Sequence, residues 1–359
     1  MLEKRRLIDK KDDYGSFTAE FYGNKIILGK TELPVGQVAT KFMELEDEQL
    51  KSLREKTLIL QAAAETIYDM TGTQIIKRDL KDFLPCFKMF LDELDKLPLF
   101  TCLQINQKQV INAFINTYNS NDKVEKTAEF LGMFLIDLMA YHDEIHIFRL
   151  YADTLLDDYV EYARFRQPKY YAKQTHKFFN DKDIQTKLQG MLLPEKYDNI
   201  FMIEQPVNIE YVTRIKPGKK REYVIAERTV YRSLGGFLKA ELFKALIAGN
   251  APRACHNCKR YFLTLGGSQL LYCSRVAPND PQGRTCLQVG RYKKQQEQDQ
   301  IPYEKAYKRA YDRLKKRKQS GTLVDKAWNE LVAEIQDIRD DARAGKIPDT
   351  VAEEKLNKY

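Results

Sequence analysis

Four cysteines in the last third of the chain have the spacing of a metal site. Cys255 and Cys258 form a Cys-x2-Cys pair, and Cys273 and Cys286 follow after 14 and 12 intervening residues. Two thiolates two residues apart can hold one ion from a tight turn, and two more can complete a tetrahedron around it. Because four thiolates fill every position of that tetrahedron, the pattern predicts a structural zinc site that leaves no position for catalysis.

Other interpretations of these cysteines remain open. Four unrelated buried thiols would need no ion. An iron–sulfur cluster often uses a run of closely spaced cysteines, which this chain lacks. His256 lies inside the Cys-x2-Cys pair and could replace one ligand, although its position favours a solvent-facing or supporting role. The two remaining cysteines, Cys86 and Cys102, lie in apolar, helix-like surroundings and are expected to be buried thiols.

The residues between the four cysteines predict a local fold. Residues 259–263 resemble a strand, 266–268 supply a turn, and 270–272 are expected to return as a second strand that delivers Cys273. Thr285 can cap a helix whose first turn carries Cys286, where the helix dipole favours a thiolate. A knuckle, a hairpin and a helix in this order describe a treble-clef finger.

Positive charge is concentrated on and just after this segment. The chain has 359 residues and a formal net charge of +8. Residues 253–318 contain 16 Lys and Arg but 5 Asp and Glu, a balance of +11, so all other residues sum to −3. A strongly basic segment on a mildly acidic body predicts a polyanionic partner, and we expect nucleic acid, DNA more than RNA.

The cations that follow Cys286 are the candidate nucleic-acid-binding residues. Several fall at helical spacing and could form a stripe that contacts phosphates without reading a base sequence. Tyr303, Tyr307 and Tyr311 alternate with them at a spacing that favours packing against the protein over stacking on bases. The plain alternative is a solvated basic helix. The candidates are Arg291, Lys293, Lys294, Lys305, Lys308, Arg309, Lys315, Lys316 and Arg317.

The hydrophobic periodicity predicts an α+β chain that is mainly α-helical, in five parts. We expect a β-hairpin around Gly23-Asn24 in residues 1–35, a helical body over 36–198, a β-hairpin plus helix over 199–252, the four-cysteine zinc finger over 253–299 and a basic helical tail over 300–359. In the tail, a helix should be interrupted near Pro302, and a last helix should start near Thr322 or Asp325 and stop at Gly345.

Several classes of protein are disfavoured. The apolar runs are too short to span a bilayer, and the charged N-terminal residues are not followed by the apolar segment of a secretory signal. No membrane partner is therefore expected, and the protein should be cytoplasmic. Thiols stay reduced there, so the clustered cysteines should bind a metal and not form disulfides.

Other chemical motifs are weaker, and we expect no enzyme. His142 and His146 are four residues apart and could share a metal, but Asp143 stands where the metalloprotease pattern requires Glu. Gly235-Gly236 lacks the Gly-Lys-Ser/Thr ending of a phosphate loop and is better explained as a helix start. No Ser–His–Asp or Cys–His catalytic arrangement can be argued.

The residues from Arg228 to Lys294 resemble the CGNR-type zinc finger of bacterial stress-linked transcription regulators. The resemblance is carried by Arg-Ala-Cys-His-Asn-Cys at 253–258, Tyr-Phe at 261–262, Tyr-Cys at 272–273 and a final cysteine that opens a basic helix. Here the family's Cys-Gly-Asn-Arg string reads Cys286-Leu287-Gln288-Val289, and the loop before it is longer. The whole chain also resembles uncharacterised Firmicute proteins with a helical N-terminal part and a C-terminal four-cysteine finger.

These features lead to one expected function and two rivals. We expect a zinc-stabilised bacterial DNA-binding regulator, and the family resemblance implies that its helical body senses a small ligand or a protein partner. One rival is a protein-interaction scaffold or mobile-element accessory factor with a purely structural finger. The other is a nuclease, because treble clefs can host His–metal sites, but no His-Asn-His-like set lies near Cys286.

Overall fold

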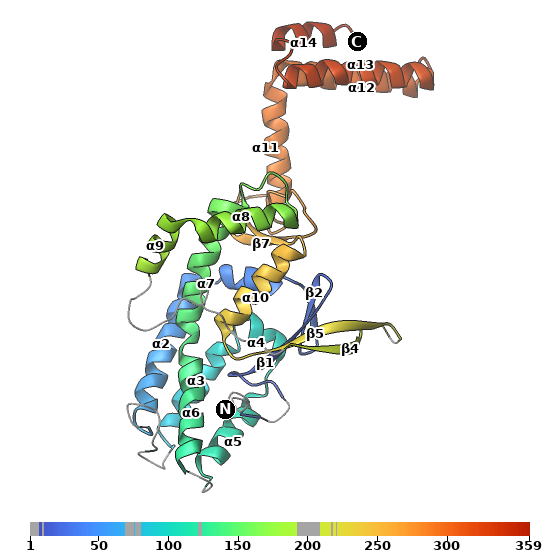
Figure 1. Cartoon of the computed structure of the whole chain (residues 1–359). Helices are drawn as coiled ribbons and strands as arrows, with labels where there is room; N and C mark the ends of the chain where they lie inside the picture. Colours follow the sequence, from blue (N-terminus) through green and yellow to red (C-terminus); the bar gives the residue numbers. More distant parts are fainter. Residues whose placement is uncertain are drawn as a thin grey trace. The chain divides into compact units, whose positions relative to one another are not determined.

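The computed structural model describes residues 7–8, 11–68, 75, 80–120, 124–191, 209–216, 218–219 and 221–359. It divides into two compact units (Figure 1). Unit 1 comprises Met1–Cys255 and Lys259–Leu270, and unit 2 comprises His256–Cys258 and Leu271–Tyr359. The predicted class, mainly α-helical α+β, is confirmed. The five-part division stays a prediction, and its boundary at 198–199 lies outside the described residues.

Unit 1 contains a five-stranded antiparallel sheet in the order β3-β2-β1-β5-β4. Gly23 and Asn24 form the two-residue turn between β1 and β2, as predicted, because Tyr22 pairs directly with Lys25. The second predicted hairpin is β4 and β5, and β5 pairs with β1, so strands about 200 residues apart share one sheet. The strands are β1 (Phe17–Tyr22), β2 (Lys25–Leu28), β3 (Thr31–Pro34), β4 (Ile209–Ile215) and β5 (Tyr223–Tyr231).

Alternation along β1 gives the sheet two different faces. Phe17, Ala19 and Phe21 are buried, and the Phe17 ring contacts Phe100 and Phe237 of two helices. The opposite face is polar and forms an open hollow of about 1240 Å³. There Glu20 accepts two hydrogen bonds of 2.6 Å from Arg214 and one of 2.9 Å from Arg228.

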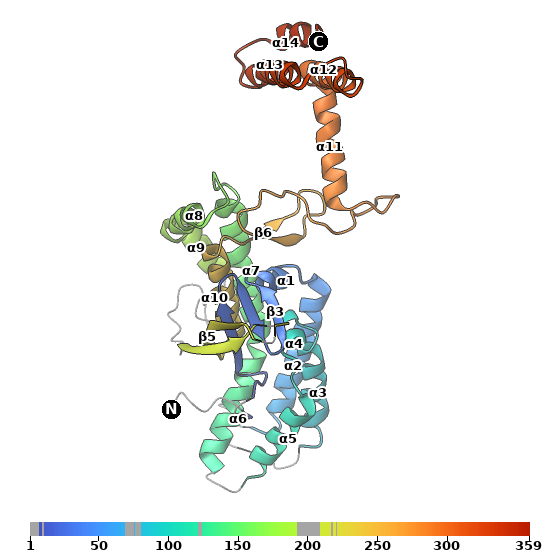
Figure 2. The same ribbon diagram turned by 90° about the vertical axis from the view of Figure 1, so that its right-hand side faces the viewer.

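The helices of unit 1, whose ribbons Figure 2 shows, share one hydrophobic core with strands of the sheet. The core includes an aromatic cluster in which the Phe83 ring stacks on Phe87 and Phe114 at centroid distances of 5.4 and 5.3 Å. The helices are α1 (Gln37–Met43), α2 (Asp47–Ala64), α3 (Phe83–Leu94), α4 (Pro98–Leu103), α5 (Gln107–Tyr118), α6 (Val124–Met139), α7 (Tyr141–Leu155), the π-helical turn η1 (Leu156–Val160), α8 (Pro168–Asn180), α9 (Lys182–Met191) and α10 (Leu234–Ile247).

Two enclosed carboxylates fix helix starts within unit 1. Glu144 of α7 accepts hydrogen bonds from Ser233 Oγ and the Gly235 amide, at 2.7 and 3.0 Å, where α10 begins. Glu241 of α10 accepts from the amides of Gly36 and Ala39, at 2.6 and 2.7 Å, where α1 begins. Burial raises the pKa of both carboxyls to about 7, and the amide donors oppose that rise.

Unit 2 ends in a three-helix bundle with a core of its own. Helix α11 (Cys286–Gln300) is followed by α12 (Pro302–Gln319), α13 (Asp325–Arg343) and α14 (Asp349–Leu356). The predicted break at Pro302 and the predicted stop at Gly345 are confirmed, whereas α14 was not predicted. Leu314, Ile335 and Leu356, one from each helix of the bundle, are fully buried in its core. Within the described residues, no helix has the length and apolar character needed to cross a membrane.

Candidate metal centre and cationic surface

The four predicted ligands come together. The Sγ atoms of Cys255, Cys258, Cys273 and Cys286 all lie within 4.8 Å of one another, and three of the four residues are buried. The Sγ atoms of Cys258 and Cys273 are 3.7 Å apart, which is too far for a disulfide bond. Zinc–sulfur bonds of about 2.3 Å in a tetrahedron place the sulfurs about 3.8 Å apart. The four cysteines are therefore positioned to bind a metal ion.

Backbone hydrogen bonds hold the first two ligands in a knuckle. The Lys259 amide donates to the Cys255 carbonyl at 2.8 Å, and Lys259 adopts the left-handed conformation with φ = 62°. The knuckle connects β6 (Ala251–Ala254) to β7 (Tyr261–Thr264), which pair with each other. The predicted return strand at 270–272 is wrong, because β7 takes its partner from the residues before the knuckle.

Buried polar contacts explain this pairing. Arg253 lies on β6 and is almost fully buried, with an ion pair to Glu161 and a hydrogen bond of 3.0 Å to the Leu270 carbonyl. Tyr261 on β7 donates to Asp157 of η1 at 2.9 Å. At Gly267 in the following turn, a Cβ would lie 2.5 Å from the Arg166 carbonyl oxygen, and φ is +78°. Only glycine satisfies both conditions.

The last two ligands are fixed by the start of α11. The Cys286 amide donates to the Arg275 carbonyl at 2.8 Å, and the Leu287 amide donates to the Cys273 carbonyl at 3.0 Å. Thr285 and Gln288 form a reciprocal capping box, with hydrogen bonds of 3.2 and 2.8 Å. The predicted cap at Thr285 is thus confirmed, and Cys286 occupies the first helical position.

The two residues inside the knuckle have different surroundings. Asn257 donates from Nδ2 to Cys286 Sγ at 3.4 Å, which stabilises a thiolate and orients it. His256 is exposed and lies edge-on to the Tyr272 ring at 6.0 Å, and the ligand group consists of cysteines alone. Of the two roles expected of His256, its exposed position fits the solvent-facing one, and the supporting contact comes from Asn257.

The weaker candidate sites do not gather further ligands. Among the described residues, the four cysteines form the only group of three or more His, Cys, Asp or Glu side chains placed to hold a metal ion. His142 Nδ1 lies 2.8 Å from Asp143, and His146 is exposed on α7. The amide donors at Gly235-Gly236 are occupied by Glu144 and Ser233, as in an ordinary helix start. Cys102 is buried, as predicted, and its burial raises the pKa of the thiol, whereas Cys86 is only half-buried.

The nine candidate nucleic-acid-binding cations are all exposed on α11 and α12. The tyrosines between them pack within the bundle: Tyr303 is buried, the Tyr311 ring lies edge-on to Trp328 at 5.7 Å, and the Arg339 guanidinium lies 4.4 Å from the centre of the Tyr307 ring. These three rings therefore pack within the bundle, as their spacing predicted.

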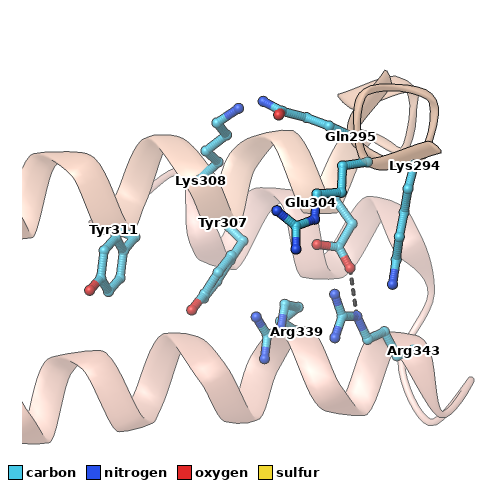
Figure 3. A pocket seen from close by; sticks show the side chains of 9 residues that line it. Lys294, Gln295, Glu304, Tyr307, Lys308, Tyr311, Arg339 and Arg343 are labelled. Atoms are coloured by element: carbon cyan, nitrogen blue, oxygen red, sulfur yellow. Dashed lines mark hydrogen bonds and ion pairs between the residues drawn. The ribbon is translucent and has the colours of Figure 1, made fainter. Parts of the chain in front are cut away.

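Sequence reasoning missed two cations of α13 that complete this surface. Arg339 and Arg343 line a groove of about 530 Å³ together with residues of α11 and α12 (Figure 3). Arg343 donates from Nε to Glu304 of α12 at 2.6 Å, the ion pair drawn in Figure 3. Their spacing of four residues on one helix was the available signal, but the acidic residues around them in the sequence obscured it.

Comparison with known proteins gives one match. The model of a family of unknown function, DUF6076, matches residues 202–358, which include β4, β5, the cysteine cluster and the C-terminal bundle. No curated protein and no solved structure matches the chain. The resemblance to the CGNR-type finger stays a prediction. Over residues 202–358, the chain is similar to a family that is defined by sequence and has no assigned activity.

Proposed function

We propose that this chain is a zinc-stabilised nucleic-acid-binding protein without enzymatic activity, and that it acts as a bacterial DNA-binding regulator. The observation that carries the proposal is the arrangement of unit 2. Three of the cysteine ligands belong to unit 2, and one of them, Cys286, opens α11; exposed cations continue from α11 along α12. A positive surface of this kind attracts polyanions and contacts backbone phosphates.

Zinc is the proposed ion because the ligand set is four sulfurs at a tetrahedral separation. The surrounding chain also needs a source of stability other than a hydrophobic core. Of residues 265–285, all of which the structure describes, only Cys273 and Ala277 are buried. Ordering a residue's backbone costs about 1–2 kcal/mol, and a structural zinc ion contributes on the order of 10 kcal/mol to the folding of small fingers.

Metal analysis tests the first half of this proposal. Protein purified without chelator should contain close to one equivalent of zinc per chain. Less than about half an equivalent of any metal would refute it. The Cys102→Ser variant is the matched control, since Cys102 is a buried thiol outside the cluster, and it should retain the wild-type metal content.

Salt dependence tests the second half. Binding of random-sequence duplex DNA should weaken steeply as salt rises, because bound cations of the DNA are released on association. Reversing the charge of Lys315, Lys316 and Arg317, all exposed near the C-terminal end of α12, should reduce the slope of log K against log salt. A protein with intact metal and no salt-dependent binding would not have this function.

A second function is favoured by a separate surface. The hairpin of β4 and β5 exposes one apolar face, on which Ile215 pairs with Tyr223 and Thr213 pairs with Ile225. Tyr211, Tyr223 and Ile225 are 75%, 67% and 72% exposed, which is unusual for large apolar side chains that lie together. This face supports the alternative of a protein-interaction scaffold or mobile-element accessory factor, in which the finger is purely structural.

A further inference from the structure

The groove between α11, α12 and α13 in unit 2 carries a strong excess of positive charge. Five of its lining side chains are cations, and Glu304 is the lining carboxylate. Asp340 adds a second carboxylate nearby, at 3.1 Å from Arg339. Even after both carboxylates are counted, three positive charges remain. The cations are Arg291 and Lys294 from α11, Lys308 from α12, and Arg339 and Arg343 from α13.

Existing contacts orient part of this charge. Glu304 is 10% exposed and accepts a hydrogen bond from Nε of Arg343, so that guanidinium is held in place at the groove. The Arg339 guanidinium lies over Tyr307, and its side chain is 21% exposed. In Figure 3, Lys294 reaches from α11 towards the end of α13 that carries Arg343. An oriented guanidinium loses less entropy on binding a phosphate than a mobile one.

The tyrosines of the groove limit what it can recognise. Figure 3 shows the rings of Tyr307 and Tyr311 pointing from α12 towards α13. Tyr307 packs against Arg339 and Tyr311 against Trp328, so each ring already has a partner within the bundle. Recognition by stacked bases would require flat aromatic faces to be available. The groove therefore favours ligands through their charge.

We propose that this groove is a phosphate-binding site, in which Arg291, Lys294 and Arg343 contact the phosphate oxygens. The assignment of its ligand rests on the proposed function, under which the phosphate belongs to the nucleic-acid backbone. The site contacts one phosphodiester without reading a base. A small phosphorylated molecule offers the same chemistry, and the experiment below distinguishes the two sources.

The position of α11 connects this site to the metal centre. Cys286 is the first residue of α11, and Arg291 and Lys294 follow five and eight residues later. Residues three apart lie on one side of a helix, so the same stretch that the cysteine ligands anchor also presents both cations. Loss of the metal releases the start of α11 and weakens phosphate binding at the groove.

The test compares two double variants of the full-length, metal-loaded protein. Arg291→Gln with Lys294→Gln removes two groove cations. Lys326→Gln with Lys355→Gln removes two exposed cations from α13 and α14 that do not line the groove. Anisotropy of labelled random-sequence duplex DNA measures nucleic-acid binding. The fluorescence of Trp328, the single tryptophan, measures binding of inorganic pyrophosphate, because Trp328 contacts the groove residue Tyr311.

At low salt, the affinity of the groove variant for DNA should be at least about tenfold lower than that of the wild type. The slope of log K against log salt should fall by about 1 for each phosphate that a cation no longer neutralises. The control variant should change much less. Addition of a chelator to the wild-type protein should also lower its affinity for DNA. Circular dichroism and metal content should match between the two variants, so that a folding defect is detected separately.

Each other outcome has a definite meaning. If the wild type binds DNA and both variants weaken binding equally, the groove inference is wrong and the proposed function stands. If DNA does not bind but pyrophosphate binds and requires the groove cations, the proposed function is wrong and the site serves a small phosphorylated ligand. If neither probe binds, both are wrong.

Discussion

Gly290→Ala in α11 is a sharp test of how the cysteine segment is packed. A Cβ at Gly290 would lie 2.4 Å from two ring carbons of Tyr272, the residue before the ligand Cys273. Carbon atoms in contact are normally about 3.5–4.0 Å apart, so the ring or the helix would have to move by about 1 Å. The Tyr272 ring also contacts His256 of the knuckle, and any shift reaches two ligand-bearing segments.

The expected magnitude follows from two opposing effects. Forcing a methyl group into a packed contact costs about 1–3 kcal/mol. Replacing glycine by alanine inside a helix contributes about 1 kcal/mol in the opposite direction. The net result is a loss of up to about 2 kcal/mol, and since 1.4 kcal/mol is a factor of ten, the metal should bind up to about thirtyfold more weakly.

A chelator competition assay on metal-loaded protein measures this loss. In a Tyr272→Ala background the obstacle is absent, so Gly290→Ala should instead strengthen metal retention through helix propensity. Gly190→Ala in α9, where a Cβ meets nothing within 4 Å, should leave metal retention unchanged and is the matched control. The packing argument fails if Gly290→Ala tightens metal binding in the wild-type background, or if its effect is the same with and without the Tyr272 ring.

Three further predictions concern the carboxylates, a helix cap and a ligand. The pKa of Glu241 is about 7 in the folded protein and about 4.5 in the unfolded chain, so the folded state holds the proton more tightly. The resulting stability, about 3 kcal/mol, is fully present below pH 4.5 and is lost as pH rises towards 7. Glu241→Gln should flatten this part of the pH profile of the unfolding free energy, measured with denaturant. Ser233→Ala removes the cap of α10 and should cost about 1 kcal/mol of unfolding free energy in the same assay; an unchanged midpoint would contradict this. Cys273→Ser should release the metal and expose residues 271–286 to limited proteolysis, while Trp328 fluorescence still reports a folded bundle; loss of both signals together would show that the bundle needs the metal.

The ligand set and the start of α11 were predictable because their signals are local. The Cys-x2-Cys pair is a short motif, and Thr285 with Gln288 three residues later reads as a capping box in the sequence. The β1–β2 hairpin was predictable for the same reason, since Gly23-Asn24 is a two-residue turn between alternating residues. The Cys-x2-Cys pair, the helix cap and the hairpin turn are each decided by residues that are near neighbours in the chain.

The elements that sequence reasoning missed depend on distant partners. β6 reads Ala-Pro-Arg-Ala, which has low strand propensity and places an arginine in a buried strand. It is stabilised by the ion pair of Arg253 with Glu161, more than 90 residues away in the chain. The pairing of β1 with β5 could not be predicted for the same reason, because no local pattern specifies which strand of a distant hairpin joins the sheet.

Total charge predicts a polyanion partner for unit 2, but the pairing of helices decides where that partner binds. α12 has 8 basic and 2 acidic residues, whereas α13 has 6 acidic and 3 basic ones. Lys318 in the last turn of α12 lies 3.1 Å from Asp325 at the start of α13, so an anion there meets a carboxylate. At the other end of α13, Arg339 and Arg343 add to the positive charge of α11. For each charge removed, Arg291 and Lys294 should therefore affect phosphate binding more than Lys315 and Lys316, a ranking that total charge alone does not give.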